Sequence, residues 1–254
     1  MMSISGIKPA PGALSQVILK QYGYKLKGHS GLIYPLIIVQ LFSSLLAIGS
    51  SGTMSSGNDF ISVALKTYTG DALLFLSFVW MIVVTSLLGS QPYRSIELSV
   101  VNSQAVSHAS NILLILTYAV YAGVTSTLAA IIHRLMIAAT LKENEFLFGG
   151  LHILPQDILL GIVAATLYLI LLGAVVYLIQ TFSLCSKGLG IILWIGFFVF
   201  GFGNVRIFDI NLGKVLEFYT AEASLGIFSL KVFCTALLLF GSSVLITKKM
   251  EVKR

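Results

Sequence analysis

The chain has 254 residues, of which 57% are hydrophobic and only 10% are charged, and its mean hydropathy is +0.95. A soluble domain carries about 25% charged residues, so this composition excludes a soluble globular protein and indicates a membrane protein. The net charge of +6 fits attraction to anionic lipid. It does not indicate nucleic-acid binding, because no soluble segment carries a basic face interleaved with aromatic residues.

Six apolar segments are long enough to cross a bilayer as helices, since about 20 residues at 1.5 Å each cover its ~30 Å hydrocarbon core. In chain order they are residues 31–50, 72–90, 112–138, 158–181, 189–205 and 225–247. The sequence therefore predicts a single all-α membrane domain over the whole chain. A cleaved signal peptide is the alternative for the first segment, but about thirty residues precede its apolar core, which is too many for a signal peptide.

An amphipathic helix is predicted ahead of the first span, at residues 13–28. Lys20 and Lys27 stay on its polar face. Its apolar face holds Leu14, Val17, Ile18 and Tyr22. A helix of this kind next to a span is expected to lie in the headgroup region of the membrane.

The distribution of basic residues predicts that both chain ends are cytoplasmic, because Lys and Arg near span ends mark that side. With this orientation the inner segments hold Lys8, Lys20, Lys25, Lys27, Arg94, Lys187, Lys248, Lys249, Lys253 and Arg254. The outer segments hold only Lys66, Lys142, Arg206 and Lys214. An even number of spans agrees with this assignment.

A polar segment, residues 93–111, separates the second and third spans on the predicted cytoplasmic side. Its apolar stripe at helical spacing contains Ile96, Val100, Val101 and Ala105. Its other face contains Glu97, Asn102, Ser103 and Gln104. Pro92, just before it, marks a break in the helix. The pattern predicts a helix lying flat on the membrane, either as a simple connector or as a docking helix for a cytoplasmic partner.

The spans nearly lack the ionisable groups that an ion-driven transporter needs at bilayer depth. His133 and Arg134 are predicted at the outer end of the third span, and Lys231 can extend outward from the sixth. The sequence contains no GxxxxGK[ST], HExxH, CxxC or GxSxG motif, so no catalytic residue, metal site or bound cofactor is predicted. We expect the energy source for any transport to lie on another chain.

Two further patterns concern packing and the outer surface. Ala119 with Gly123, and Gly161 with Ala165, have the four-residue spacing that lets helices approach closely. Residues 206–224 alternate apolar and charged residues, which predicts one or two short amphipathic helices. These would form an outer gate or simply tether two spans. Their apolar side contains Phe208, Leu212, Leu216, Phe218 and Tyr219.

Taken together, this pattern resembles the permease subunits of exporter-class, type-2 ABC transporters. The resemblance covers nearly the whole chain as architecture and is carried most closely by YRSIELSVVNSQAVSHASNILL, residues 93–114. This stretch is similar to that family's acidic residue, leucine-rich stretch and Pro-Val-Ser before the third span. Here residues 105–107 read Ala-Val-Ser, and only Arg94 matches the Arg and Gly-Thr found around the acidic residue.

The resemblance implies a coupling helix at residues 93–108, inserted into a groove of a separate ATP-binding subunit, with Glu97 as its acidic contact. It also implies two permease subunits, identical or homologous, in a bacterial or archaeal plasma membrane, with ATP and Mg²⁺ bound by the partner. The implied docking residues are Tyr93, Arg94, Glu97, Asn102, Ser103, Gln104 and His108.

The abundance of aromatic residues favours an amphipathic or hydrophobic cargo, such as a peptide, an antibiotic or a lipid, exported between the two permeases. Candidate path residues are Trp80, Tyr118, Tyr121, Phe197 and Phe202. The alternative is that these aromatic side chains contact lipid or neighbouring helices.

Two other functions stay open at this point. A self-contained channel or carrier would need polar groups near the bilayer midplane, where the sequence offers Gln40, Thr117, Tyr118, Tyr121 and Thr125. A non-transporting membrane protein that neutralises a toxic peptide would bind that peptide with or without ATP. An intramembrane enzyme ranks lowest, because Ser107 and His108 are sequence neighbours and point about 100° apart on a helix.

Overall fold

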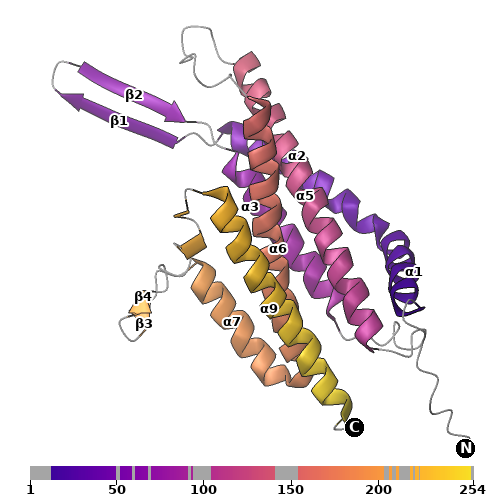
Figure 1. Ribbon diagram of the computed structural model, residues 1–254. Helices are drawn as coiled ribbons and strands as arrows, with labels where there is room; N and C mark the ends of the chain where they lie inside the picture. The colour runs from indigo at the N-terminus through magenta and orange to yellow at the C-terminus, as the bar shows by residue number, and fades with distance from the viewer. Residues whose placement is uncertain are drawn as a thin grey trace, which may run out of the picture.

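A computed structural model of the chain describes residues 13–49, 52–58, 61–67, 70–90, 93, 104–140, 154–202, 206–207, 210–211, 218–219, 221–222 and 224–252. Long helices that lie side by side make up most of these residues (Figure 1). The helices are α1 (Ala13–Gly28), η1 (Ser30–Leu32), α2 (Ile33–Gly49), α3 (Asp71–Leu88), α5 (Gln104–Thr140), α6 (Pro155–Cys185), α7 (Lys187–Phe202) and α9 (Leu225–Val252).

Five helical segments are long and apolar enough to cross a membrane, so the chain is a multi-pass membrane protein. They are Ser30–Ala47, Asp71–Leu88, Val106–Ile137, Pro155–Cys185 and Leu225–Thr247. Each coincides with a predicted span. The remaining predicted span, residues 189–205, falls on α7, which is apolar but only 16 residues long, or about 24 Å at 1.5 Å per residue.

From α2 onward, successive helices run in alternating directions, and α7 takes its place in that order between α6 and α9 (Figure 1). The start of α5, the end of α6 and the end of α9 consequently lie at one end of the bundle, together with α1. We call this the α1 end. The other end carries the β1–β2 hairpin and is called the hairpin end.

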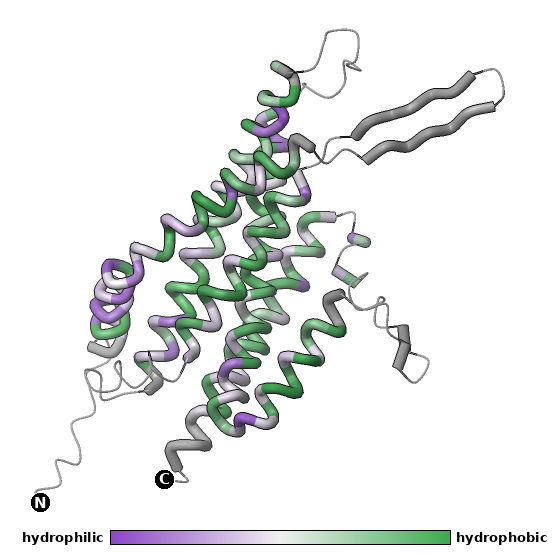
Figure 2. The backbone as a smooth tube through the Cα atoms, turned by 180° about the vertical axis from the view of Figure 1, so that it is seen from behind, coloured by the Kyte–Doolittle hydropathy of each residue, from purple (hydrophilic) through white to green (hydrophobic). Residues whose placement is uncertain are grey.

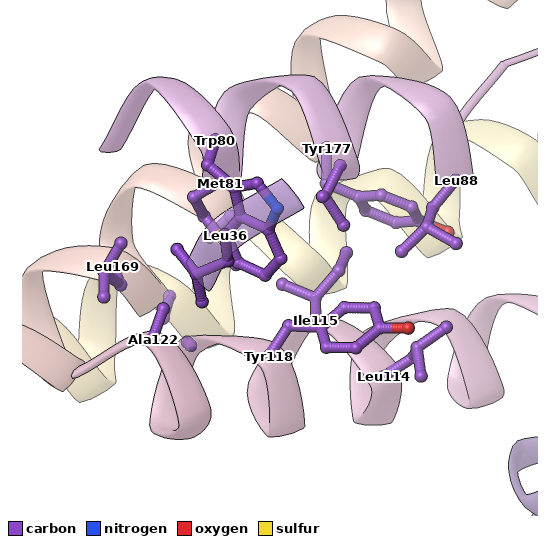
Figure 3. Packing of buried hydrophobic residues seen from close by; sticks show 14 of the residues in the cluster. Leu36, Trp80, Met81, Leu88, Leu114, Ile115, Tyr118, Ala122, Leu169 and Tyr177 are labelled. Carbon is purple, nitrogen blue, oxygen red and sulfur yellow. The ribbon is translucent and has the colours of Figure 1, made fainter. Parts of the chain in front are cut away.

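The core of the bundle lies among α2, α3, α5 and α6, as Figure 3 shows for residues such as Leu36, Met81, Ile115 and Leu169, each fully buried. The α5–α6 contact is close because of Gly123. A Cβ at that position would lie 2.3 Å from Thr166 Oγ1 and 2.9 Å from the Thr166 backbone nitrogen. The predicted role of small residues in helix packing is confirmed here.

Two antiparallel hairpins connect helices at the hairpin end, where the sequence reading expected loops or short helices. Strand β1 (Gly52–Asn58) pairs with β2 (Ile61–Thr67), and β3 (Arg206–Ile207) pairs with β4 (Ile210–Asn211). The all-α prediction is confirmed as the fold class, and the two short hairpins between the helices are features that it did not include. Strand β2 reads I-S-V-A-L-K-T, in which β-branched and apolar residues alternate with smaller or polar ones, as strands prefer.

Candidate functional site

The most concentrated polar contacts between helices lie at the α1 end. Lys25 of α1 is only 3% exposed, and its Nζ donates to Asn111 Oδ1 at 2.5 Å and to the Ser107 carbonyl oxygen at 3.2 Å, both on α5. A buried ammonium is stable only where oxygen atoms replace its water. These contacts therefore fix the position of α1 against the first turns of α5.

The first turns of α5 are also bonded to α6. His108 Nδ1 lies 2.6 Å from the Tyr177 hydroxyl, and both side chains are buried. Beside this pair is a pocket of about 10 Å³, which is room for about one water. It is lined by Ser107, His108 and Asn111 of α5, by Tyr177, Thr181 and Leu184 of α6, and by Leu88 and Gly89 at the end of α3. We call Lys25, Ser107, His108, Asn111 and Tyr177 the basal joint. It connects three helices at the base of α5.

Further bonds extend the contact of α1 with α5 away from the basal joint. The hydroxyls of Tyr22 and Thr117 are 2.8 Å apart, and the Tyr118 hydroxyl donates to the His29 carbonyl oxygen at 2.9 Å. The sequence predicted an apolar face with Val17 and Tyr22 for this helix in the headgroup region. In the structure Val17 is 47% exposed, and the side of α1 that packs on α5 holds Tyr22 together with the buried Lys25.

The structure describes only some of the predicted docking residues. Arg94, Glu97, Asn102 and Ser103 lie outside the described residues, and for Gln104 only the helical backbone is described. Tyr93 is partly exposed, with its ring 5.3 Å from that of His29. His108 is 5% exposed and bonded to Tyr177, so it faces α6, and its assignment as a partner contact stays a prediction.

The start of α5 also corrects the prediction of a flat helix through residue 111. From Gln104 onward the chain belongs to the long membrane helix. Polar Ser107, His108 and Asn111 can enter the bundle because α1 and α6 supply their hydrogen-bond partners.

A second polar cluster lies midway along the bundle. The Gln40 side-chain amide donates to Ser77 Oγ at 3.2 Å and to Thr125 Oγ1 at 3.0 Å, so that α2, α3 and α5 meet at one side chain. Trp80 Nε1 donates to the Leu32 carbonyl oxygen at 3.1 Å. These groups hold α2, α3 and α5 together and join η1, at the start of α2, to α3.

The candidate cargo-path residues take different positions. Trp80 and Tyr118 are buried in the core with their rings 5.9 Å apart (Figure 3), and Tyr121 packs against that core. Phe197 belongs to an aromatic group on α7 with Trp194 and Phe198. The side chain of Phe202 lies outside the described residues. For Trp80 and Tyr118, the alternative interpretation of contact with neighbouring helices describes what is observed.

Lys231, near the hairpin end of α9, contacts residues of the connection that precedes this helix. Its Nζ forms an ion pair with Glu222, donates to the Phe218 carbonyl oxygen at 3.2 Å and lies 3.8 Å from the centre of the Phe218 ring. Tyr168 of α6 donates from its hydroxyl to the Tyr219 carbonyl oxygen at 3.3 Å. Phe218, Tyr219 and Glu222 thus link α6 to α9.

The other predicted residues of this end are placed as follows. Phe208, Leu212 and Leu216 lie outside the described residues. Arg134 is exposed, whereas His133 is 1% exposed and neither of its ring nitrogens has a hydrogen-bond partner. Both residues lie in the last turns of α5, in line with their predicted place near the outer end of the span, and His133 faces the neighbouring helices.

Nothing in the described part of the chain groups three or more His, Cys, Asp or Glu side chains as a metal site would. Comparison of the sequence with protein-family models and with curated proteins, and of the fold with solved structures, finds no match. The burial of Lys25 against α5 was not predicted from the sequence. The available signal was its spacing of three residues from Tyr22, because residues three apart share a helix face.

Proposed function

We propose that the chain is the membrane subunit of an ATP-driven exporter, similar to type-2 ABC permeases, with six spans and both ends in the cytoplasm. α7 then forms the fifth span. The cargo is an amphipathic or hydrophobic molecule, and a separate ATP-binding subunit supplies the energy. Two such permeases, identical or homologous, act together in the plasma membrane of a bacterium or archaeon.

The basal joint is the observation that carries this proposal. Residues 94–103, which include Glu97 and Asn102, directly precede α5 in the chain. The first turns of α5 are bonded to α1 through Lys25 and to α6 through Tyr177. A force applied just before α5 is therefore passed to three helices at once. Transmission of this kind requires a rigid element joined to both the moving partner and the spans.

The bonding of the polar groups that the sequence predicted near the midplane supports an external energy source over a self-contained carrier. Gln40 bonds Thr125 and Ser77, Thr117 bonds Tyr22, and Tyr118 bonds the His29 carbonyl oxygen. Polar groups that join helices are not available to bind an ion or solute without a rearrangement of the bundle. Energy for that rearrangement has to come from outside the described spans.

The test is site-specific photo-crosslinking of the full chain in native membranes. A photoreactive amino acid is introduced at Glu97 or Asn102, with the exposed α7 residue Ile192 as the matched control. We expect crosslinks from positions 97 and 102, but not 192, to one subunit that carries a phosphate-binding GxxxxGK[ST] loop. In the purified complex, Glu97→Lys should lower the permease-stimulated ATPase rate about ten-fold, the effect of 1.4 kcal/mol.

Two results would contradict the proposal. One is the absence of any crosslink from positions 97 and 102 to a nucleotide-binding protein. The other is transport by the purified single chain in liposomes without nucleotide, which would favour the channel or carrier.

A further inference from the structure

The lysines of α1 fall into two groups. Lys25 is buried and bonded to α5. Lys20 and Lys27 are exposed on the same helix, and no described residue forms an ion pair or hydrogen bond with either ammonium. Because Lys25 and Tyr22 fix one side of α1 to α5, the direction in which the exposed side faces is fixed as well.

The exposed side of α1 combines positive charge with apolar surface. Residues 17, 20, 24 and 27 follow each other at spacings of three, four and three, so they share one helix face. Val17 is 47% exposed and Tyr24 is 76% exposed on this face. Hydrophilic residues are concentrated in α1 relative to the membrane helices (Figure 2). We call Val17, Lys20, Tyr24 and Lys27 the basic face of α1.

The connection to α2 places this face at the membrane boundary. Only His29 separates α1 from η1, and the first membrane-crossing segment begins at Ser30. Tyr34, in the first turn of α2, is 70% exposed. Exposed tyrosines and lysines next to the start of a span are characteristic of the headgroup region.

We propose that the basic face of α1 binds the phosphate groups of anionic phospholipids in the leaflet at the α1 end. Lys20 and Lys27 are two helical turns apart, or about 10 Å, so each can pair with a separate headgroup while Tyr24 lies between them. Val17 and Tyr24 contribute apolar contact with the upper acyl chains. Charge complementarity selects the lipid, since a basic patch beside a membrane attracts anionic headgroups. This inference does not depend on the proposed function.

Lipid titration of the purified full chain tests the proposal. The protein is delipidated in detergent, and binding of fluorescent phosphatidylglycerol is compared with that of phosphatidylcholine carrying the same label. We expect selective binding of phosphatidylglycerol that weakens as NaCl is raised. Each lysine contributes about five-fold, so Lys20→Gln and Lys27→Gln should each weaken binding about five-fold and the double variant about 25-fold.

Two variants serve as controls. Lys20→Arg with Lys27→Arg retains both charges and should bind phosphatidylglycerol within two-fold of the original chain. Lys187→Gln removes an exposed lysine at the start of α7, also at the α1 end, and should have little effect. Unchanged elution in size-exclusion chromatography establishes that each variant is folded. If the double glutamine variant does not fold, the two single glutamine variants test the proposal on their own.

The proposal is overturned if the glutamine variants retain phosphatidylglycerol affinity within two-fold. It is also overturned if Lys187→Gln weakens binding as much as Lys20→Gln, because the effect would then reflect overall charge. Intact lipid binding together with loss of the ATP-binding subunit from the purified complex would instead identify the basic face as a protein-docking surface.

Discussion

The two sides of the bundle are held together by different forces. On one side, α1, α2, α3 and α5 are connected by side-chain hydrogen bonds at the basal joint, at Gln40 and at Trp80. On the other side, the side-chain hydrogen bonds observed for α9 stay within that helix or reach the connection before it. α7 and α9 pack against α6 mainly through apolar side chains, and Phe218, Tyr219 and Glu222 add polar links.

This difference indicates which part of the molecule can move. Apolar contacts between helices in lipid gain little, because lipid tails are as apolar as the side chains they replace. Hydrogen bonds across helices fix one geometry, since a polar group that leaves its partner in the bilayer is left unsatisfied. We expect α1, α2, α3 and α5 to behave as one block, with α7 and α9 able to shift along α6.

The largest expected effect comes from enlarging the close contact between α5 and α6. Gly123→Leu places a side chain where a Cβ alone would meet the Thr166 backbone at 2.9 Å, so the helices must separate. We expect a loss of about 3 kcal/mol of stability, at the upper end for overpacking, measured by thermal unfolding monitored by size-exclusion chromatography.

A matched control for that variant lies on α7. Nothing approaches within 4 Å of a Cβ built at Gly196, so Gly196→Leu should leave the unfolding temperature almost unchanged. Equal destabilisation by both variants would contradict the contrast between a close α5–α6 contact and an open α7 surface.

A smaller effect is expected from removing the side chain that joins α2, α3 and α5. Gln40→Leu deletes two interhelical bonds, whereas Ser77 and Thr125 still donate to carbonyl oxygens of their own helices. Because interhelical bonds in membranes average about 0.6 kcal/mol, we expect a loss of about 1 kcal/mol in the same unfolding assay.

The control for Gln40→Leu is a hydroxyl on the other side of the bundle. Thr235 bonds only carbonyl oxygens of α9 itself, so Thr235→Val should cost less. If Thr235→Val proved as harmful as Gln40→Leu, hydrogen bonding would not distinguish the two sides.

The smallest effect concerns the ion pair that connects α9 to residues 218–222. A double-mutant cycle with Lys231→Met and Glu222→Gln should give a coupling energy of about 0.5–1 kcal/mol, since both side chains are partly exposed and solvent screens the pair. The exchanged pair, Lys231→Glu with Glu222→Lys, should recover part of that energy. Coupling within error of zero would remove this pair as a connection between α9 and the outer segment.

The sequence was sufficient for the membrane helices because a long apolar run has few alternatives in a bilayer. It was insufficient at the base of α5, where Ser107, His108 and Asn111 have the polarity of a surface helix. Lys25 lies 82 positions from Ser107 and 86 from Asn111, and Tyr177 lies 69 positions from His108. A single sequence does not reveal pairs so far apart.

The candidate cargo path was likewise predicted in composition but not in its contacts. The aromatic residues Trp80 and Tyr118 suited a cargo path by composition, but their hydrogen-bonding groups meet backbone carbonyl oxygens near η1 and their rings enter the core. The β1–β2 hairpin was missed because its alternating pattern is short and lies between two strongly helical segments.

The 16-residue length of α7 has a consequence for the surrounding membrane. In the proposed arrangement with α7 as the fifth span, its 16 described residues would cover about 24 Å, which is about 6 Å less than a typical hydrocarbon core. Lipid beside α7 would then have to thin to meet it, at a fraction of a kcal/mol per ångström, while the neighbouring α6 and α9 would impose no such demand. The activity of the protein should consequently depend on acyl-chain length, with shorter lipids favouring the arrangement described here.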